Sequence, residues 1–303
     1  SALWEYSSNK LGSNISIVGF GEVLPGTQKI LLVIYNRTDA TYRLAGLDTV
    51  TMGLTFGSKI PWKPDIILVG NLGSRYGYII GKKIGSRIYM VDENGIIIGM
   101  KDTNGLAVLD IFVKDLDMDG VDEILVTYDA GNSNQYVAYT VTFSQIFGIS
   151  NVYSNVLVAD IFDTFNGYES IVIRSLDEIN YYFEVYGSSG ECIISECIEQ
   201  KNGATYYHIP LWLNAMVDDY ILMFIAESNK PNGYLLSICE ENMTISDLLS
   251  VELDRYEFYG DGIIYSPENM SIGRVFAVKD GIPLTIIELM VSFDMASPQV
   301  SIE

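Results

Sequence analysis

Short apolar runs rich in Ile, Val, Leu and Tyr recur along this chain at a nearly constant interval. The six runs comprise residues 30–35, 78–82, 124–128, 171–174, 220–226 and 274–278. Their centres lie about 46 to 53 residues apart, an interval typical of architectures in which each repeat is one sheet of four strands. Since Ile, Val and Tyr favour strands, this interval constrains the chain to a repetitive all-β fold.

Other strand-like segments complete each repeat. Every run has an apolar partner shortly before it, at residues 15–20, 65–70, 108–113, 156–162, 206–213 and 262–265. Two more segments follow it, at residues 136–143 and 149–153 in the third repeat and at 181–186 and 192–198 in the fourth. Asn94-Gly95 and Asp280-Gly281 lie between such segments, and these dipeptides favour tight hairpins because they adopt positive φ angles. Each repeat is therefore predicted to be an antiparallel four-stranded meander.

A closed ring is the arrangement that best satisfies such sheets. Sheets that pack face to face around an axis bury both faces, and closure protects the strand edges. We therefore predict a six-bladed β-propeller of four-stranded antiparallel blades, with seven blades as the alternative, in one domain over residues 1–303. One segment, residues 244–257, has a helix-like start with Thr244 and Asp247 as a capping box, but an outer strand at 248–253 is the preferred interpretation.

The third repeat contains a loop with regularly spaced acids. Asp115, Asp117, Asp119 and Glu123 occupy loop positions one, three, five and nine, and Gly120 occupies position six. Carboxylates at this spacing can surround one hard cation, and Ca²⁺ suits them better than Mg²⁺, which prefers fewer protein ligands. The alternative is an ordinary, exposed acidic turn that binds nothing.

The third repeat, VLDIFVKDLDMDGVDEILVTYD, resembles an FG-GAP or VCBS-type repeat of integrin-like β-propellers. The fourth, VLVADIFDTFNGYESIVIRS, is a degraded copy in which Asp160 matches the first ligand position and the later spacing slips. The resemblance implies a propeller fold, one structural Ca²⁺ in an outer loop, and extracellular recognition. It also implies the ligand set: the side chains of Asp115, Asp117, Asp119 and Glu123, and the backbone carbonyl of Val121.

Charge and composition exclude several classes of partner. The chain has 18 basic and 39 acidic residues, a net charge of −21, so it would repel nucleic acids and anionic lipid headgroups. No apolar run approaches the length of a membrane span. We expect an extracellular, cell-surface or virion-surface glycoprotein, because four Asn-x-Ser/Thr sequons occur and the chain starts at Ser1 rather than Met. The sequons are at Asn14, Asn36, Asn242 and Asn269.

Signals for catalysis are weak. The single histidine, His208, lies in a strand-like run and is interpreted as structural. The glycine-rich residues 73–83 fail the phosphate-loop pattern and are predicted to form a hairpin. Cys192 and Cys197 are five residues apart, so on one continuous strand they would lie on opposite faces and we expect no direct bridge between them. The preferred interpretation of the cysteines is small buried hydrophobic residues, and a bridge from one of these two to Cys239 is the alternative. A non-enzymatic protein is therefore the preferred interpretation, enzymatic activity stays open as the alternative, and no catalytic residue is predicted.

Three functions remain open on the sequence. The first is a non-enzymatic extracellular scaffold that binds a protein or glycan on a loop face, as in cell adhesion, a surface appendage or a virion. The second is a carbohydrate-active hydrolase or lyase with its site at the central channel, because paired carboxylates cannot be recognised by spacing among 39 acids. The third is a structural subunit that self-assembles into a filament or capsid.

Overall fold

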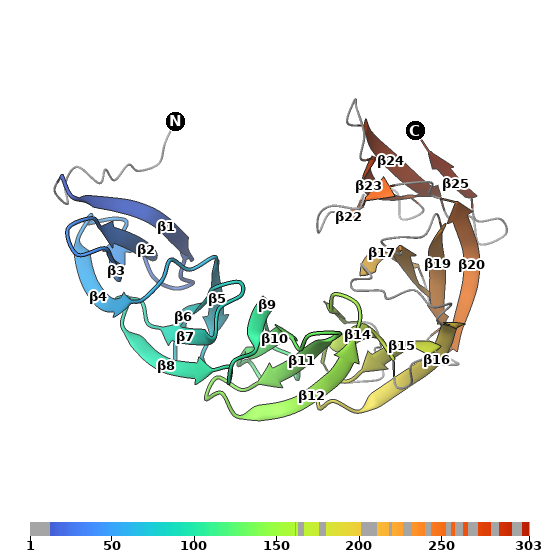
Figure 1. Ribbon diagram of the computed structural model, residues 1–303, viewed down its shortest axis with the longest axis horizontal. Coiled ribbons are helices and arrows are strands. Elements are labelled where there is room, and N and C mark those ends of the chain that lie inside the picture. Colours follow the sequence, from blue (N-terminus) through green and yellow to red (C-terminus); the bar gives the residue numbers. More distant parts are fainter. Residues whose placement is uncertain are drawn as a thin grey trace. The chain divides into compact units, whose positions relative to one another are not determined.

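Four-stranded antiparallel meanders build the whole described part of the chain (Figure 1). The computed structural model describes residues 13–160, 162, 167–175 and 180–200, and after residue 200 only the strands between 211 and 302. Side chains are described as far as residue 197. The chain divides into two compact units, one of residues 1–131 and 135–149, the other of residues 132–134 and 150–303. The prediction of a single domain over 1–303 stays a prediction.

The first three repeats predicted from the sequence correspond to three meanders. The first is β1 (Ile15–Val23), β2 (Lys29–Asn36), β3 (Thr41–Asp48) and β4 (Leu54–Ile60). The second is β5 (Ile66–Asn71), β6 (Tyr76–Gly81), β7 (Arg87–Val91) and β8 (Ile97–Asp102). The third is β9 (Ala107–Lys114), β10 (Glu123–Asp129), β11 (Asn134–Tyr139) and β12 (Gln145–Val152). In each, the recurring apolar run forms the second strand.

The last three repeats follow the same plan. The fourth is β13 (Leu157–Ala159), β14 (Glu169–Arg174), β15 (Asn180–Tyr186) and β16 (Cys192–Gln200). The fifth is β17 (Leu211–Val217), β18 (Tyr220–Ala226), β19 (Asn232–Cys239) and β20 (Thr244–Glu252). The sixth is β22 (Ile263–Tyr265), β23 (Ile272–Lys279), β24 (Thr285–Ser292) and β25 (Gln299–Ile302), with β21 (Tyr256–Glu257) also paired to β23. A pair between Val152 and Arg174 joins β12 to β14.

The start of β20 differs from the sequence-based expectation. β20 begins at Thr244 rather than at 248, because it pairs with β19 from Thr244 opposite Cys239 onward; the strand interpretation of this segment is confirmed and the capping box is wrong. β17 includes residues 211–213 of the strand predicted at 206–213, and residues 206–210 lie outside the described residues.

Cys192 and Cys197 lie on the same face of β16, so their predicted placement on opposite faces is wrong. A register shift in the β15–β16 ladder places Cys192 opposite Tyr186, whereas Cys197 lies opposite Tyr182. The extra residue reverses the side-chain alternation that a continuous strand would keep. Both cysteines are free and exposed, so the interpretation of them as buried hydrophobic residues is wrong. Five residues of strand separate them by roughly 16 Å, which agrees with the expectation of no direct bridge.

The core of the first unit lies between successive sheets. Alternate residues of β2 and β3, among them Leu31, Val33 and Leu44, pack against Tyr78 and Ile80 of β6. A second cluster joins the β5–β8 sheet to the β9–β12 sheet through Ile66, Ile79, Ile88, Val108, Ile111, Ile124 and Val126. Because successive strand residues point to opposite faces, each central strand supplies both interfaces. The nearly continuous apolar runs in the sequence are explained by this two-sided burial.

Tyr78 ties the first two sheets together through its hydroxyl. The β1–β2 ladder is irregular between Phe20 and Val23, and the Tyr78 hydroxyl fills the gap. It accepts from the Leu31 backbone N–H at 2.9 Å and donates to the Glu22 carbonyl at 2.8 Å. Its burial raises the pKa of Tyr78 above the usual range of a phenol, so the group remains a neutral donor and acceptor.

Tyr78→Phe should destabilise the protein by about 1–3 kcal/mol, because it leaves a buried N–H and a carbonyl without their partner. Urea unfolding followed by circular dichroism measures the change in midpoint. Tyr76→Phe is the matched control, since Tyr76 is exposed and its variant should unfold like the wild type. Equal midpoints for the two variants would contradict the bridging role.

Candidate metal centre in the β9–β10 loop

The acidic segment forms the turn that joins β9 to β10. Glu123, the first residue of β10, pairs with Lys114, the last residue of β9, so Asp115 and Glu123 start and end the turn side by side. Met118 and Gly120 have positive φ angles of 59° and 88°. Gly120 adopts this conformation without steric cost, as its position in the predicted loop requires.

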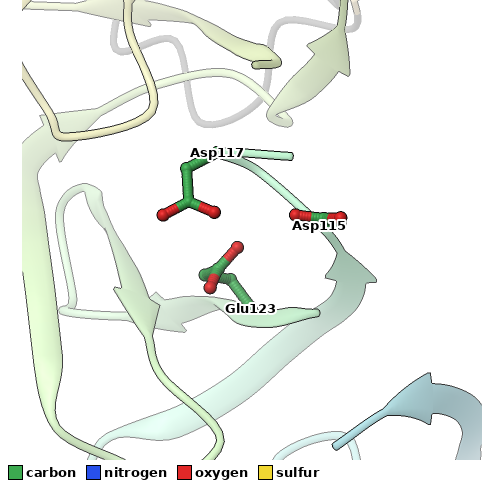
Figure 2. Close-up of side chains that lie close together, drawn as sticks. All are labelled: Asp115, Asp117 and Glu123. Carbon is green, nitrogen blue, oxygen red and sulfur yellow. The ribbon is translucent and has the colours of Figure 1, made fainter. Parts of the chain in front are cut away.

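Three carboxylates converge in this turn. One oxygen from each of Asp115, Asp117 and Glu123 lies within 4.8 Å of the others. Figure 2 shows the three side chains turned toward a common space. Asp115 is half-buried, Asp117 is exposed and Glu123 is buried. The structure therefore brings together three of the five predicted ligands.

Asp119, the fourth carboxylate of the predicted ligand set, lies outside this group of three. The Asp119 carboxylate accepts from the Val121 backbone N–H at 2.7 Å, so it stabilises the turn instead of joining the group of three. The turn is also held by the Asp115 carboxylate, which accepts from the Gly120 N–H at 2.9 Å. Asp117 accepts from the Asp119 N–H at 3.2 Å. The roles of Asp119 and of the Val121 carbonyl as ligands stay predictions.

Glu123, at the end of the turn, combines a backbone partner with a raised pKa. Its Oε2 accepts from the Leu116 backbone N–H at 2.7 Å. Burial is the main cause that raises the pKa of Glu123 to about 7. The nearby carboxylates of Asp117, Asp119 and Asp115 add to this rise because like charges disfavour ionisation. A cation at the centre of the group would favour the ionised form of Glu123 and so oppose the rise in its pKa.

The donor set fits a hard cation. Asp115 Oδ1 is buried and has no hydrogen-bond partner, although a buried carboxylate oxygen is costly to leave unsatisfied. The group offers only oxygen, which Ca²⁺ and Mg²⁺ prefer, and carboxylates that can bind through one or two oxygens suit the larger, more flexible shell of Ca²⁺. Among the residues described, these three acids form the one group with metal-ligand spacing.

A related contact in the fourth repeat was not predicted. Glu169, the buried first residue of β14, accepts from the Phe162 backbone N–H at 3.4 Å, as Glu123 accepts from Leu116. The signal in the sequence was an acid at the start of the second strand of both repeats. Asp160 is exposed at the end of the preceding segment, and residue 161 and residues 163–166 lie outside the described residues.

The structure also bears on the glycine-rich residues 73–83 and on the question of a membrane span. Residues 73–83 form the turn and second strand of the β5–β6 hairpin, as predicted, with Leu72 N–H donating to the Arg75 carbonyl. His208 lies outside the described residues. Within the described part of the chain, no helix has the length and apolarity to cross a membrane.

Comparison with known proteins reports on the fold. No protein-family model and no curated protein sequence matches the chain. Among solved structures, Sqt1 of Saccharomyces cerevisiae matches with a TM-score of 0.55 and 8% identity over 92% of this chain and 72% of Sqt1. The Dos1 propeller matches with a TM-score of 0.53 and 12% identity over 99% and 74% of the two chains. Both are β-propellers. The chain has a β-propeller fold.

A third similar structure is NirN, a dihydro-haem d1 dehydrogenase, with a TM-score of 0.51 and 8% identity over 96% of this chain and 63% of NirN. At identities of 8–12%, the similarity between this chain and the three structures extends to the fold alone. Proteins with the same fold can have unrelated functions. The function has to be argued from the side chains of this chain.

Proposed function

We propose that this β-propeller is a non-enzymatic scaffold with one structural Ca²⁺ in the β9–β10 turn. The observation that carries the proposal is the convergence of the Asp115, Asp117 and Glu123 carboxylates, and the buried Asp115 Oδ1, which has no hydrogen-bond partner, supports it. A cation there would bind both ends of the turn and neutralise the carboxylates. The third repeat also resembles calcium-loop repeats in its sequence, and Asp119 and the Val121 carbonyl would complete the shell.

The scaffold would have six blades, one for each four-stranded meander. The six recurring runs of the sequence, each the second strand of its meander, support this count. Class averages from electron microscopy of the intact chain would count the blades directly. Seven blades, or an open arrangement of sheets, would contradict the proposal.

Loops at one end of the ring would bind a protein or a glycan outside the cell. The net charge of −21 supports a neutral, cationic or metal-bridged partner and opposes nucleic acids. A glycan array and affinity capture from cell-surface fractions, each performed with Ca²⁺ and with chelator, test this role. Ca²⁺-dependent capture of one defined partner would support it. Hydrolysis of an array glycan would instead favour the carbohydrate-active alternative.

Calcium should raise the melting temperature of the wild-type protein by several degrees. A ligand that binds only the folded state stabilises it by about 3 kcal/mol when its free concentration is a hundred times the Kd. Scanning calorimetry in Ca²⁺ and in chelator measures the difference. Asp117→Ala should abolish it, whereas Asp129→Ala should retain it, because Asp129 lies at the other end of β10, where its side chain accepts from the Gly131 N–H. An unchanged wild-type melting temperature would refute the metal site.

A further inference from the structure

We infer that Asn71 and Asp122 are positioning residues for the cation turn, and that cation binding fixes the β5–β6 hairpin against it. This inference rests on the proposed Ca²⁺ site. Neither residue belongs to the ligand pattern, and Asn71 lies in the preceding sheet. The inference concerns the geometry of the site and how binding there reaches a neighbouring sheet.

Three hydrogen bonds join the two segments. The Asn71 backbone N–H donates to Asp122 Oδ2 at 2.5 Å, and the Asp122 N–H donates to the Asn71 carbonyl at 2.9 Å. The Asn71 side-chain amide donates to the Gly120 carbonyl at 2.5 Å. Gly120 and Asp122 flank Val121, whose carbonyl is the predicted backbone ligand. The hairpin therefore holds the turn on both sides of that position.

The β5–β6 hairpin packs closely against β9 and the turn. A Cβ atom on Gly70 would lie 2.7 Å from Val113 Cγ1, so the glycine permits β5 to pack closely against β9, and the same Cβ would be in ordinary contact with Asp122 Oδ2 at 3.6 Å. A Cβ on Gly73 would touch the Val121 side chain at 3.4 Å. Asn71 Oδ1 also accepts from the Gly73 N–H at 3.0 Å, which fixes the amide group in the orientation that reaches Gly120.

The physical consequence is a coupling between cation and hairpin. Side chains behind the ligands of a metal site orient those ligands, and their loss typically weakens metal binding 10- to 100-fold. Because coupling between two sites is reciprocal, a hairpin that holds the turn for the cation is itself held more firmly when the cation binds. Asn71 carries no charge, so its effect on affinity cannot come from direct attraction of the ion.

Calorimetric titration with CaCl₂ tests the role of Asn71. Asn71→Ala should weaken Ca²⁺ binding roughly tenfold, and Asn71→Ser should do the same, because serine can accept from Gly73 but is too short to reach Gly120. Asn36→Ala is the matched control: Asn36 accepts from the Thr38 N–H in a similar exposed turn distant from the site, and its variant should bind like the wild type. Wild-type affinity in both Asn71 variants would overturn the inference.

Two substitutions at Asp122 distinguish an effect on Ca²⁺ affinity through its hydrogen bond to Asn71 from an effect through its negative charge. Asp122→Asn removes the charge but keeps an oxygen that can accept from Asn71, so its affinity should stay close to that of the wild type. Asp122→Ala removes the acceptor as well and should weaken binding roughly tenfold. Equal weakening by both substitutions would mean that Asp122 acts through its charge, and this result would overturn a positioning role.

Hydrogen exchange supplies a readout that does not depend on affinity. In the wild type, saturating Ca²⁺ should slow exchange of the Asn71 and Asp122 amides, whose hydrogen bonds join the two segments. In Asn71→Ala at saturating Ca²⁺ this added protection should be lost at Asp122. If the wild type does not bind Ca²⁺, the proposed function fails; if it binds but the Asn71 amide exchanges equally with and without the ion, only the coupling fails.

Discussion

Glu123→Gln should be more stable than the wild type in chelator and less stable than the wild type in Ca²⁺. In chelator the substitution removes a buried carboxylate among three other acids, the same repulsion and burial that raise the pKa of Glu123 to about 7. The glutamine oxygen can still accept from Leu116. In Ca²⁺ the wild type gains about 3 kcal/mol at a hundredfold excess over Kd, and the variant, which lacks a ligand, gains little.

Urea unfolding at pH 8, with Ca²⁺ and with chelator, measures this crossing of stabilities. Asp129→Asn is the matched control, because it also removes one acid from β10 but lies at the opposite end of the strand. Its midpoint should respond to Ca²⁺ as the wild type does. A Glu123→Gln variant that is as responsive to Ca²⁺ as the wild type would show that Glu123 is not a ligand.

Gly57→Ala and Gly46→Ala should each destabilise the protein by about 1–3 kcal/mol or more, the usual cost of overpacking a well-packed site. The turn between β7 and β8 contacts the β3–β4 pair of the first sheet at these two glycines. A Cβ on Gly57 would lie 2.1 Å from the Gly95 carbonyl oxygen, and one on Gly46 would lie 2.2 Å from the Glu93 carbonyl oxygen. Backbone atoms cannot move aside as a flexible side chain could, so the turn must shift.

The shift would also break hydrogen bonds of the docked turn. The Ser58 N–H donates to the Gly95 carbonyl at 2.8 Å, and Lys29 Nζ donates to Asn94 Oδ1 at 2.7 Å. Gly19→Ala is the control for adding a methyl group to the same sheet, because its Cβ would meet Val33 at an ordinary 3.5 Å. The denaturant midpoints of the three variants test the contact between the β7–β8 turn and the first sheet. A Gly57→Ala midpoint equal to that of Gly19→Ala would contradict this contact.

The architecture could be predicted from the sequence because the signal was repeated six times. Two-sided burial makes the second strand of each meander a continuous apolar run. Once this strand is recognised, the segments before and after it can be assigned as its neighbouring strands. β10 illustrates this: Val126 packs toward the β5–β8 sheet while Leu125 is buried on the other face. Register was less predictable, because the extra residue opposite Val185 and Tyr186 that reverses the face of Cys192 leaves no mark in the composition of β16.

The candidate site was predictable in part for a similar reason. Asp115, Asp117 and Glu123 lie within nine consecutive residues, so local turn geometry alone brings them together. The same geometry also offers Asp119 a competing partner, the Val121 N–H, and spacing cannot decide between the two. Asn71 lies 49 residues before Gly120, and nothing in its own surroundings marks it as a neighbour of the acidic turn.

By itself, the sequence determined the four-stranded repeat, the strand order within each meander, and the turn in which the acids gather. All three are local properties, set by residues that are close along the chain. Only the tertiary structure decided which groups meet across sheets: the Tyr78 hydroxyl in the β1–β2 gap, the Gly95 carbonyl at Gly57, and Asn71 beside the acidic turn. Such contacts depend on the twist and offset of neighbouring sheets, which arise from the packing of many side chains at once and are encoded in no single segment.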